Sequence, residues 1–190
     1  MAEWKRVKWA EARQIGEALE LEPEQLPEPE ILPRPWFETL RGRGESGLAL
    51  RYLAVALPRY EAVAWAAHTI NAGTAQAPIA PLERQALDRV LRWVEEPTDE
   101  YRQAAQEAAS RARSGSAERL LGDALFMSGG SIAPPDLPAV IPPSNVCGQL
   151  AAAAVLVACH RGPEPAKAIT AALDSGDRVA ADGLEALRQA

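Results

Sequence analysis

A long stretch with almost no charge constrains the fold of this chain more than any other feature. Between Asp123 and Arg161 the only charged side chain is that of Asp136. The second half of the stretch, Asn145–His160, is apolar on every face of a helix. A helix that is apolar all round is normally buried, because none of its faces suits water. The sequence therefore predicts a central core helix over Asn145–His160, with the rest of the chain packed around it.

A membrane span over the same segment is the alternative, but its length and composition argue against one. Asn145–His160 has 16 residues, among them Asn145, Gln149 and many alanines, whereas a span needs about 20 strongly apolar residues. The first residues, MAEWKRVKWAEARQ, lack the continuous apolar core of a signal peptide. Cys147 and Cys159 lie about 18 Å apart along the predicted helix, too far for a disulfide with each other. Buried thiols suit a reducing compartment, so we expect a soluble cytoplasmic protein without membrane insertion.

Helical periodicity extends over most of the remaining chain. Alanine and leucine are abundant, while isoleucine, threonine, phenylalanine and tyrosine are scarce, which favours helices over sheets. Apolar residues recur at helical spacing over residues 10–19, 48–57, 58–71, 81–96, 99–113, 116–127, 165–175 and 177–189. Gly176 is expected to break the chain between the last two helices. No strand-like alternation is present, so we predict an all-α bundle of about seven to nine helices around the central helix.

Two proline-rich segments interrupt the helical pattern. Glu20–Pro35 contains five glutamates and five prolines and predicts an extended linker, with Ile31 and Leu32 as anchors. Ile132–Pro143 also contains five prolines, so it must be irregular, but it is apolar enough to lie against the core. The predicted division is an N-terminal arm and linker over residues 1–35 and a single helical domain over residues 36–190.

The sequence indicates neither a metal site nor a nucleic-acid-binding surface. His68, His160, Cys147 and Cys159 lack the close spacing of zinc ligands. A net charge of −6 argues against binding that depends on contacts with phosphate groups. We therefore expect no metal, no cofactor and no nucleic acid partner.

The motif Ser128-Gly129-Gly130-Ser131 looks at first like a phosphate-binding loop. Such loops place their amides at the positive N-terminus of a helix, whereas this motif follows a predicted helix and lies at its negative end. We interpret it as a structural loop, a helix C-cap with Gly130 at positive φ that leads into the proline-rich turn. A serine nucleophile here would need a general base, and the chain has only two histidines.

One cluster on the predicted helix 58–71 is the main candidate for binding. Glu61, Trp65 and His68 fall at positions i, i+4 and i+7 of one face, with Arg59 nearby. Because Trp and Arg are frequent in interface hot spots, these four and Trp36 beside the arm are candidate partner-binding residues. The simpler interpretation is a packed Trp65 with polar neighbours at the surface. Glu61 and His68 lie roughly 10 Å apart along the helix axis, too far for a direct hydrogen bond in acid–base chemistry.

Two stretches resemble a family of small helical bacterial proteins of unknown function. Leu57–Ala66 is similar to its LP(R/K)xEAVxWA pattern, with Ala64 where the family often has a second Trp, and Phe126–Pro135 is similar to its SGGSxAPP pattern. Members are often encoded near type VI secretion genes. The resemblance, which covers roughly Leu48–His160, implies a helical fold and an accessory role in secretion, and it supplies no catalytic residues.

Two functional hypotheses follow. The first is a non-enzymatic cytoplasmic adaptor or chaperone-like accessory protein for a type VI secretion system, with a secretion component or an effector as its protein partner. The alternative is a small-molecule-binding or enzymatic helical domain that uses the Arg59/Glu61/Trp65/His68 face or the Ser128–Ser131 loop. A deep polar pocket at either place would favour the alternative, whereas a broad apolar groove would favour the adaptor. The sequence leaves the oligomeric state open.

Overall fold

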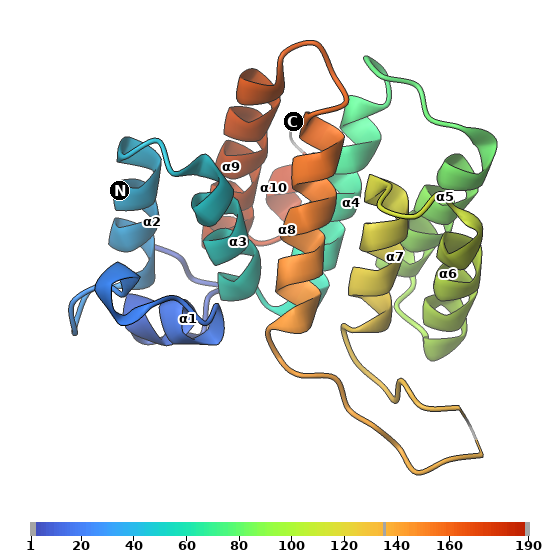
Figure 1. The fold of residues 1–190 in the computed structure, drawn as a ribbon, viewed down its shortest axis with the longest axis horizontal. Helices are drawn as coiled ribbons and strands as arrows, with labels where there is room; N and C mark the ends of the chain where they lie inside the picture. The colour runs from blue at the N-terminus through green and yellow to red at the C-terminus, as the bar shows by residue number, and fades with distance from the viewer. Residues whose placement is uncertain (1–2, 135, 189–190) are drawn as a thin grey trace.

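The computed structural model describes residues 3–134 and 136–188, and within these ranges the chain forms helices and no strands (Figure 1). The helices are α1 (Ala12–Ala18), the 3-10 turn η1 (Pro23–Gln25), α2 (Pro33–Gly42), α3 (Ser46–Ala56), α4 (Arg59–Gly73), α5 (Pro81–Glu95), α6 (Asp99–Arg111), α7 (Ala117–Phe126), α8 (Val146–Cys159), α9 (Pro165–Asp182) and α10 (Glu185–Arg188). The all-α prediction is confirmed. The described residues contain ten α-helices, one more than the upper expectation, and α10 is a single turn of four residues.

Helix α8 occupies the middle of the bundle, as predicted for Asn145–His160. Helices α3, α4, α7 and α9 pack around it (Figure 1). Cys147, Ala151 and Val155 are fully buried. Complete burial of the helix is nevertheless wrong, because one face of its last turns is uncovered and Val157 is 39% exposed. No helix of the described chain is both long and apolar enough to cross a membrane.

Glycines within helices allow close contacts between neighbouring elements of the bundle. A Cβ atom at Gly148 would lie 2.7 Å from the carbonyl oxygen of Ala54, so α8 rests directly on the backbone of α3. A Cβ at Gly122 of α7 would overlap the Cβ of Ala109 in α6. A larger residue at either position would push two helices apart, since the obstructing atoms belong to the backbone or lie next to it.

The predicted helix break at Gly176 is wrong. Helix α9 is continuous over Pro165–Asp182. A Cβ at Gly176 would overlap Cδ2 of Leu53 and lie 3.0 Å from Nε1 of Trp65. The glycine leaves room for these side chains, and the packing offsets its helix propensity penalty of about 1 kcal/mol relative to alanine. The helix ends instead at Gly183, where φ is +79°.

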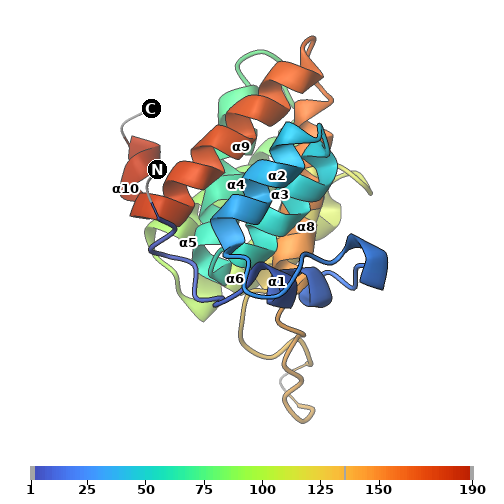
Figure 2. The same ribbon diagram turned by 90° about the vertical axis from the view of Figure 1, so that its left-hand side faces the viewer.

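The N-terminal arm packs on the bundle from its first described residues. Trp4 is buried, its ring centroid lies 5.1 Å from that of Phe37, and its Nε1 donates a hydrogen bond to Asp177 at 2.7 Å. Trp9 donates through Nε1 to the carbonyl of Val55 at 3.2 Å. Figure 2 shows the arm running from the end of α9 toward α1. Apolar and polar contacts therefore both hold this segment in place.

The acidic linker over residues 20–35 contains more helix than predicted. Helix α2 already begins at Pro33, because proline suits the first turn of a helix. Ile31 is half-buried, and its carbonyl accepts a hydrogen bond from the N–H of Ala12 at 2.7 Å. Leu32 is 56% exposed, so its predicted role as an anchor is wrong. The division of the chain after residue 35 stays a prediction, and this boundary falls within α2.

Candidate functional site: a projecting loop held by two arginines

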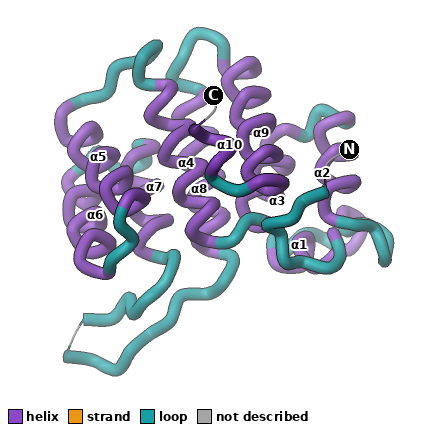
Figure 3. Tube along the Cα trace, turned by 180° about the vertical axis from the view of Figure 1, so that it is seen from behind, coloured by secondary structure: helices purple, strands orange, loops and turns teal. Residues whose placement is uncertain are grey.

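The connection between α7 and α8 projects from the bundle as a long loop (Figures 1 and 3). It begins with the Ser128–Ser131 motif and continues into a segment that we call the apolar loop, residues 132–134 and 136–143. Leu137, Val140 and Ile141 of this segment are 56%, 50% and 66% exposed. The expectation that the segment lies against the core is therefore wrong. The contacts that hold it lie at its base and are described next.

Arg102 of α6 holds the start of the loop. Its guanidinium is buried and donates through Nη1 to the carbonyl of Phe126 at 2.9 Å and through Nη2 to that of Ser131 at 3.2 Å. Its Nε donates to Asp99 at 2.7 Å, and the group stacks over the Phe126 ring at 4.8 Å from the centroid. The last carbonyls of a helix lack partners within it and carry partial negative charge, so a cation is stabilising there.

Arg102 is not among the residues that the sequence motifs single out. One signal does point to it, because Arg102 precedes Ala105 and Ala109 by three and seven residues and so shares their buried stripe. A charged residue within an apolar stripe needs a polar partner inside the fold. The identity of that partner, a loop some thirty residues further on, is set by tertiary structure alone.

Gly130 makes room for this arginine. Its φ is +69°, as predicted. A Cβ atom here would lie 2.8 Å from Nη2 of Arg102 and 3.2 Å from Oδ1 of Asp99. Glycine is therefore needed both for the positive φ and for the room that it leaves to these side chains. The predicted role as a helix C-cap is wrong, because α7 ends at Phe126 and Met127 caps it with right-handed backbone angles.

Ser131 joins the two arms of the loop at their base. Its Oγ accepts hydrogen bonds from the N–H groups of Ala133 at 3.1 Å and Val140 at 3.2 Å. The N–H of Ile132 in turn donates to the carbonyl of Val140 at 2.9 Å. The hydroxyl oxygen is thus engaged with the backbone, which fits a structural role for this serine better than a nucleophilic one.

Arg59 extends from α4 to the same loop. Its Nη1 donates to the carbonyl of Ser128 at 3.2 Å. We call Arg59 and Arg102 together the arginine clamp. Glu61, two residues further along α4, contacts the N-terminal arm instead, since its buried carboxylate pairs with Nη2 of Arg6 at 2.6 Å. The structure therefore brings Arg59 to the Ser128–Ser131 motif and leaves Glu61 with a separate partner.

Trp65 belongs to the core. It is fully buried, and its Nε1 donates to the carbonyl of Ala172 at 3.1 Å and to Oγ of Ser175 at 3.2 Å, both in α9. Trp65 therefore cannot contact a partner while α9 is in place. His68 is exposed and lines a cavity of about 530 Å³ beside α9, where partial burial lowers the pKa of its imidazole. The predicted face of four residues is thus divided between the clamp, the arm, the core and the surface.

Trp36 on α2 offers little surface to a partner. Its side chain is 9% exposed, and the guanidinium of Arg43 lies over its ring at 5.1 Å from the centroid. Its Nε1 has no hydrogen-bond partner among the described residues. A protein that bound Trp36 would first have to displace Arg43.

Both cysteines are free and buried. Burial raises the pKa of the Cys147 thiol to about 12 and also raises the pKa of Cys159. Thiols in such surroundings stay protonated, which makes them poor nucleophiles and poor metal ligands. Within residues 3–134 and 136–188, no group of three or more His, Cys, Asp and Glu side chains is placed to hold a metal ion.

The region that contains the arginine clamp matches the sequence model of a known protein family. The sequence model of a family of unknown function, DUF6931, matches residues 36–180. The chain belongs to this family. No curated protein and no solved structure matches the chain. The matched region contains both clamp arginines and the apolar loop, whereas the N-terminal arm precedes it, and the match agrees with the predicted resemblance to a family of unknown function.

Proposed function

We propose that this protein is a non-enzymatic adaptor that binds another protein through the apolar loop. The observation that carries the proposal is the exposure of Leu137, Val140 and Ile141 on a loop whose base the arginine clamp holds. Soluble proteins rarely expose apolar side chains together unless these form an interaction site. Packing cannot account for the exposure, because the same residues would lose contact with water by lying on the bundle.

The rigid base of the loop supports a role in binding. Long loops without helix or strand are usually either functional or disordered. Arg59 and Arg102 donate hydrogen bonds to the base of this loop, and the hydroxyl oxygen of Ser131 accepts one from the N–H of Val140 there. Prolines restrict the backbone further, so less conformational entropy is lost when a partner binds. Asp136 is its one charged residue, so we expect the contact to be mainly apolar and little affected by salt.

We propose a partner with an apolar groove of the kind that receives proline-rich segments. The resemblance noted from the Leu57–Ala66 and Phe126–Pro135 motifs suggests where to look for it. A type VI secretion component or an effector is the first candidate, and the cytoplasm is the proposed place of the contact.

The alternative of a small-molecule-binding or enzymatic domain has less support. Glu61 pairs with Arg6, and Trp65 is buried beneath α9. The carbonyls of Ser128 and Ser131 accept hydrogen bonds from the arginine clamp. Each of these groups has a partner within the protein, and of the predicted face only His68, which lines the cavity beside α9, is exposed.

The test replaces the exposed apolar side chains of the loop by serine. The loop variant carries Leu137→Ser, Val140→Ser and Ile141→Ser, and the matched control carries Leu32→Ser and Leu82→Ser at exposed positions elsewhere. Partners are captured from native cells, identified by mass spectrometry, and binding is measured again with purified components. We expect the loop variant to lose affinity by at least about tenfold and both variants to keep the wild-type melting temperature. Equal affinity of the loop variant and the wild type would overturn the proposal.

A further inference from the structure

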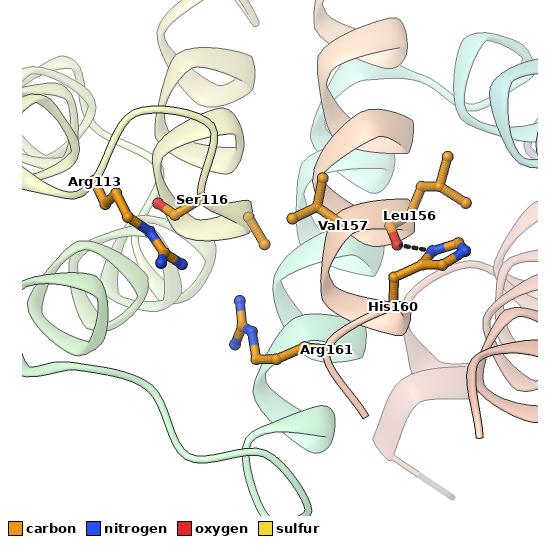
Figure 4. A pocket seen from close by; sticks show the side chains of 7 residues that line it. Arg113, Ser116, Leu156, Val157, His160 and Arg161 are labelled. Carbon is orange, nitrogen blue, oxygen red and sulfur yellow. Dashed lines mark hydrogen bonds between the residues drawn. The ribbon is translucent and has the colours of Figure 1, made fainter. Parts of the chain in front are cut away.

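A second surface lies between the turn that joins α6 to α7 and the end of α8 (Figure 4). It is an open groove of about 420 Å³. Arg113 and Arg161 enter it from opposite sides, and their guanidinium groups point toward one another (Figure 4). Leu156 and Val157 of α8 line it with apolar surface, and Val157 is 39% exposed.

One buried carboxylate holds the side chain of Arg161, and another binds the backbone of Arg113. Glu118 is fully buried, and its Oε1 accepts a hydrogen bond from Nη2 of Arg161 at 2.7 Å. Glu83 is also buried and accepts from the backbone N–H of Arg113 at 3.2 Å. Arg161 thus has a counter-ion, whereas the side chain of Arg113 forms no ion pair within the described part of the chain. The guanidinium of Arg113 is exposed, so its positive charge is available to an anion in the groove.

The start of α7 also lies at the groove, with the carboxylate of Glu118 in its first turn paired to Arg161. Ser116 lines the groove and is the N-cap of α7, with its Oγ accepting from the N–H of Arg119 at 3.3 Å. The N-terminus of a helix favours anions, because its first N–H groups and its dipole are positive. The helix end and the guanidinium of Arg113, unpaired among the described residues, therefore attract the same kind of ligand.

We propose that this groove binds an aliphatic carboxylate. A guanidinium matches a carboxylate with paired hydrogen bonds, and Leu156 and Val157 offer an apolar surface beside it. A small inorganic anion would use the arginines and leave this surface without a contact. The ligand is either a small organic acid or the C-terminus of a polypeptide that ends in an apolar residue, since both present the same chemistry. The proposal does not depend on the apolar loop, so its test is independent of the adaptor test.

The test is an NMR titration of the full chain with hexanoate, hexanol and inorganic phosphate, followed by the backbone amide signals of residues 156 and 157, which every variant keeps. The variants are Arg113→Gln and Val157→Ser, and the matched control is Arg89→Gln at an exposed position of α5. Arg161 is kept, because its loss would leave Glu118 buried without a cation. We expect hexanoate to bind, Arg113→Gln to weaken it by at least about tenfold, Val157→Ser to weaken it severalfold and the control to leave it unchanged.

A short peptide that ends in leucine distinguishes the two sources of the carboxylate. Tighter binding of this peptide than of both its amidated form and hexanoate would assign the groove to chain ends, and tighter binding of hexanoate would assign it to small acids. The proposal is overturned if hexanol or phosphate binds as tightly as hexanoate, or if Arg113→Gln leaves the affinity unchanged. It is also overturned if neither hexanoate nor the peptide binds.

Discussion

The two proline-rich segments of this chain behave in opposite ways. The segment over residues 20–35 is acidic, yet it lies along the bundle with Pro27 and Pro33 buried. The apolar loop carries one charge, yet it projects into solvent and leaves the side chain of Ile141 66% exposed. Average polarity predicts the reverse, because apolar side chains favour burial. The difference teaches that a few anchoring contacts, rather than composition, decide where a proline-rich segment lies.

Arginine side chains anchor both segments. In one case the arginine belongs to the segment, and in the other the arginines belong to the bundle. In the first segment Arg34 extends into the bundle and pairs with Asp177 at 2.8 Å, with both side chains largely buried. The clamp arginines Arg59 and Arg102 belong to the bundle and donate to carbonyls at the base of the loop. The arm is thus held along its length, whereas the loop is held only at its base.

The largest expected effect concerns the arm. If it is part of the folded unit, Trp4→Ala should lower the free energy of unfolding by about 3–5 kcal/mol, as truncation of a buried aromatic does. Leu137→Ala in the apolar loop should change it by less than about 0.5 kcal/mol. Chemical denaturation followed by circular dichroism measures both. Equal denaturation midpoints for the two variants would show that the arm and the loop contribute equally to the stability of the fold. Deletion of residues 1–35 is for the same reason unsuitable as a test of partner binding.

A smaller effect is expected where the loop leads into α8. Gly148→Ala should destabilise the protein by about 1–3 kcal/mol, because its Cβ meets the backbone of α3. The same substitution at Gly47, inside α3, meets no atom within 4 Å and should stabilise by up to about 1 kcal/mol. If α8 packs closely on α3, thermal melts should show a lower melting temperature for Gly148→Ala and a higher one for Gly47→Ala. A stabilising Gly148→Ala would mean that the helix after the loop is loosely packed.

The smallest effect concerns the base of the loop. Gly130→Ala should cost about 1–2 kcal/mol, because alanine disfavours φ of +69° and its Cβ approaches Arg102. Amide hydrogen exchange at Val140 should become faster as the base loosens. Gly129→Ala is the control, since its Cβ meets nothing within 4 Å. If the two substitutions had equal effects, the arginine clamp would not explain why the loop projects.

Local rules predicted most of the fold and part of the site. Apolar stripes identified the helices because each bundle helix buries one face, and the position of the double glycine after a helix predicted the positive φ of Gly130. The errors concern contacts between distant parts of the chain. Gly176 was expected to break a helix because nothing nearby in sequence shows that Leu53 and Trp65 lie against it. Arg59 is predicted as a partner-binding residue, although its guanidinium donates to the Ser128 carbonyl.

The most direct test of the central claim measures solvent access to the apolar loop in solution. With a soluble paramagnetic gadolinium chelate, the methyl signals of Leu137, Val140 and Ile141 should broaden as strongly as those of exposed Leu32 and far more than those of buried Ile15. Methyl groups of the loop that are protected as well as those of Ile15 would place the segment against the core, where its composition alone would put it, and would contradict the claim that the protein presents this loop to a partner.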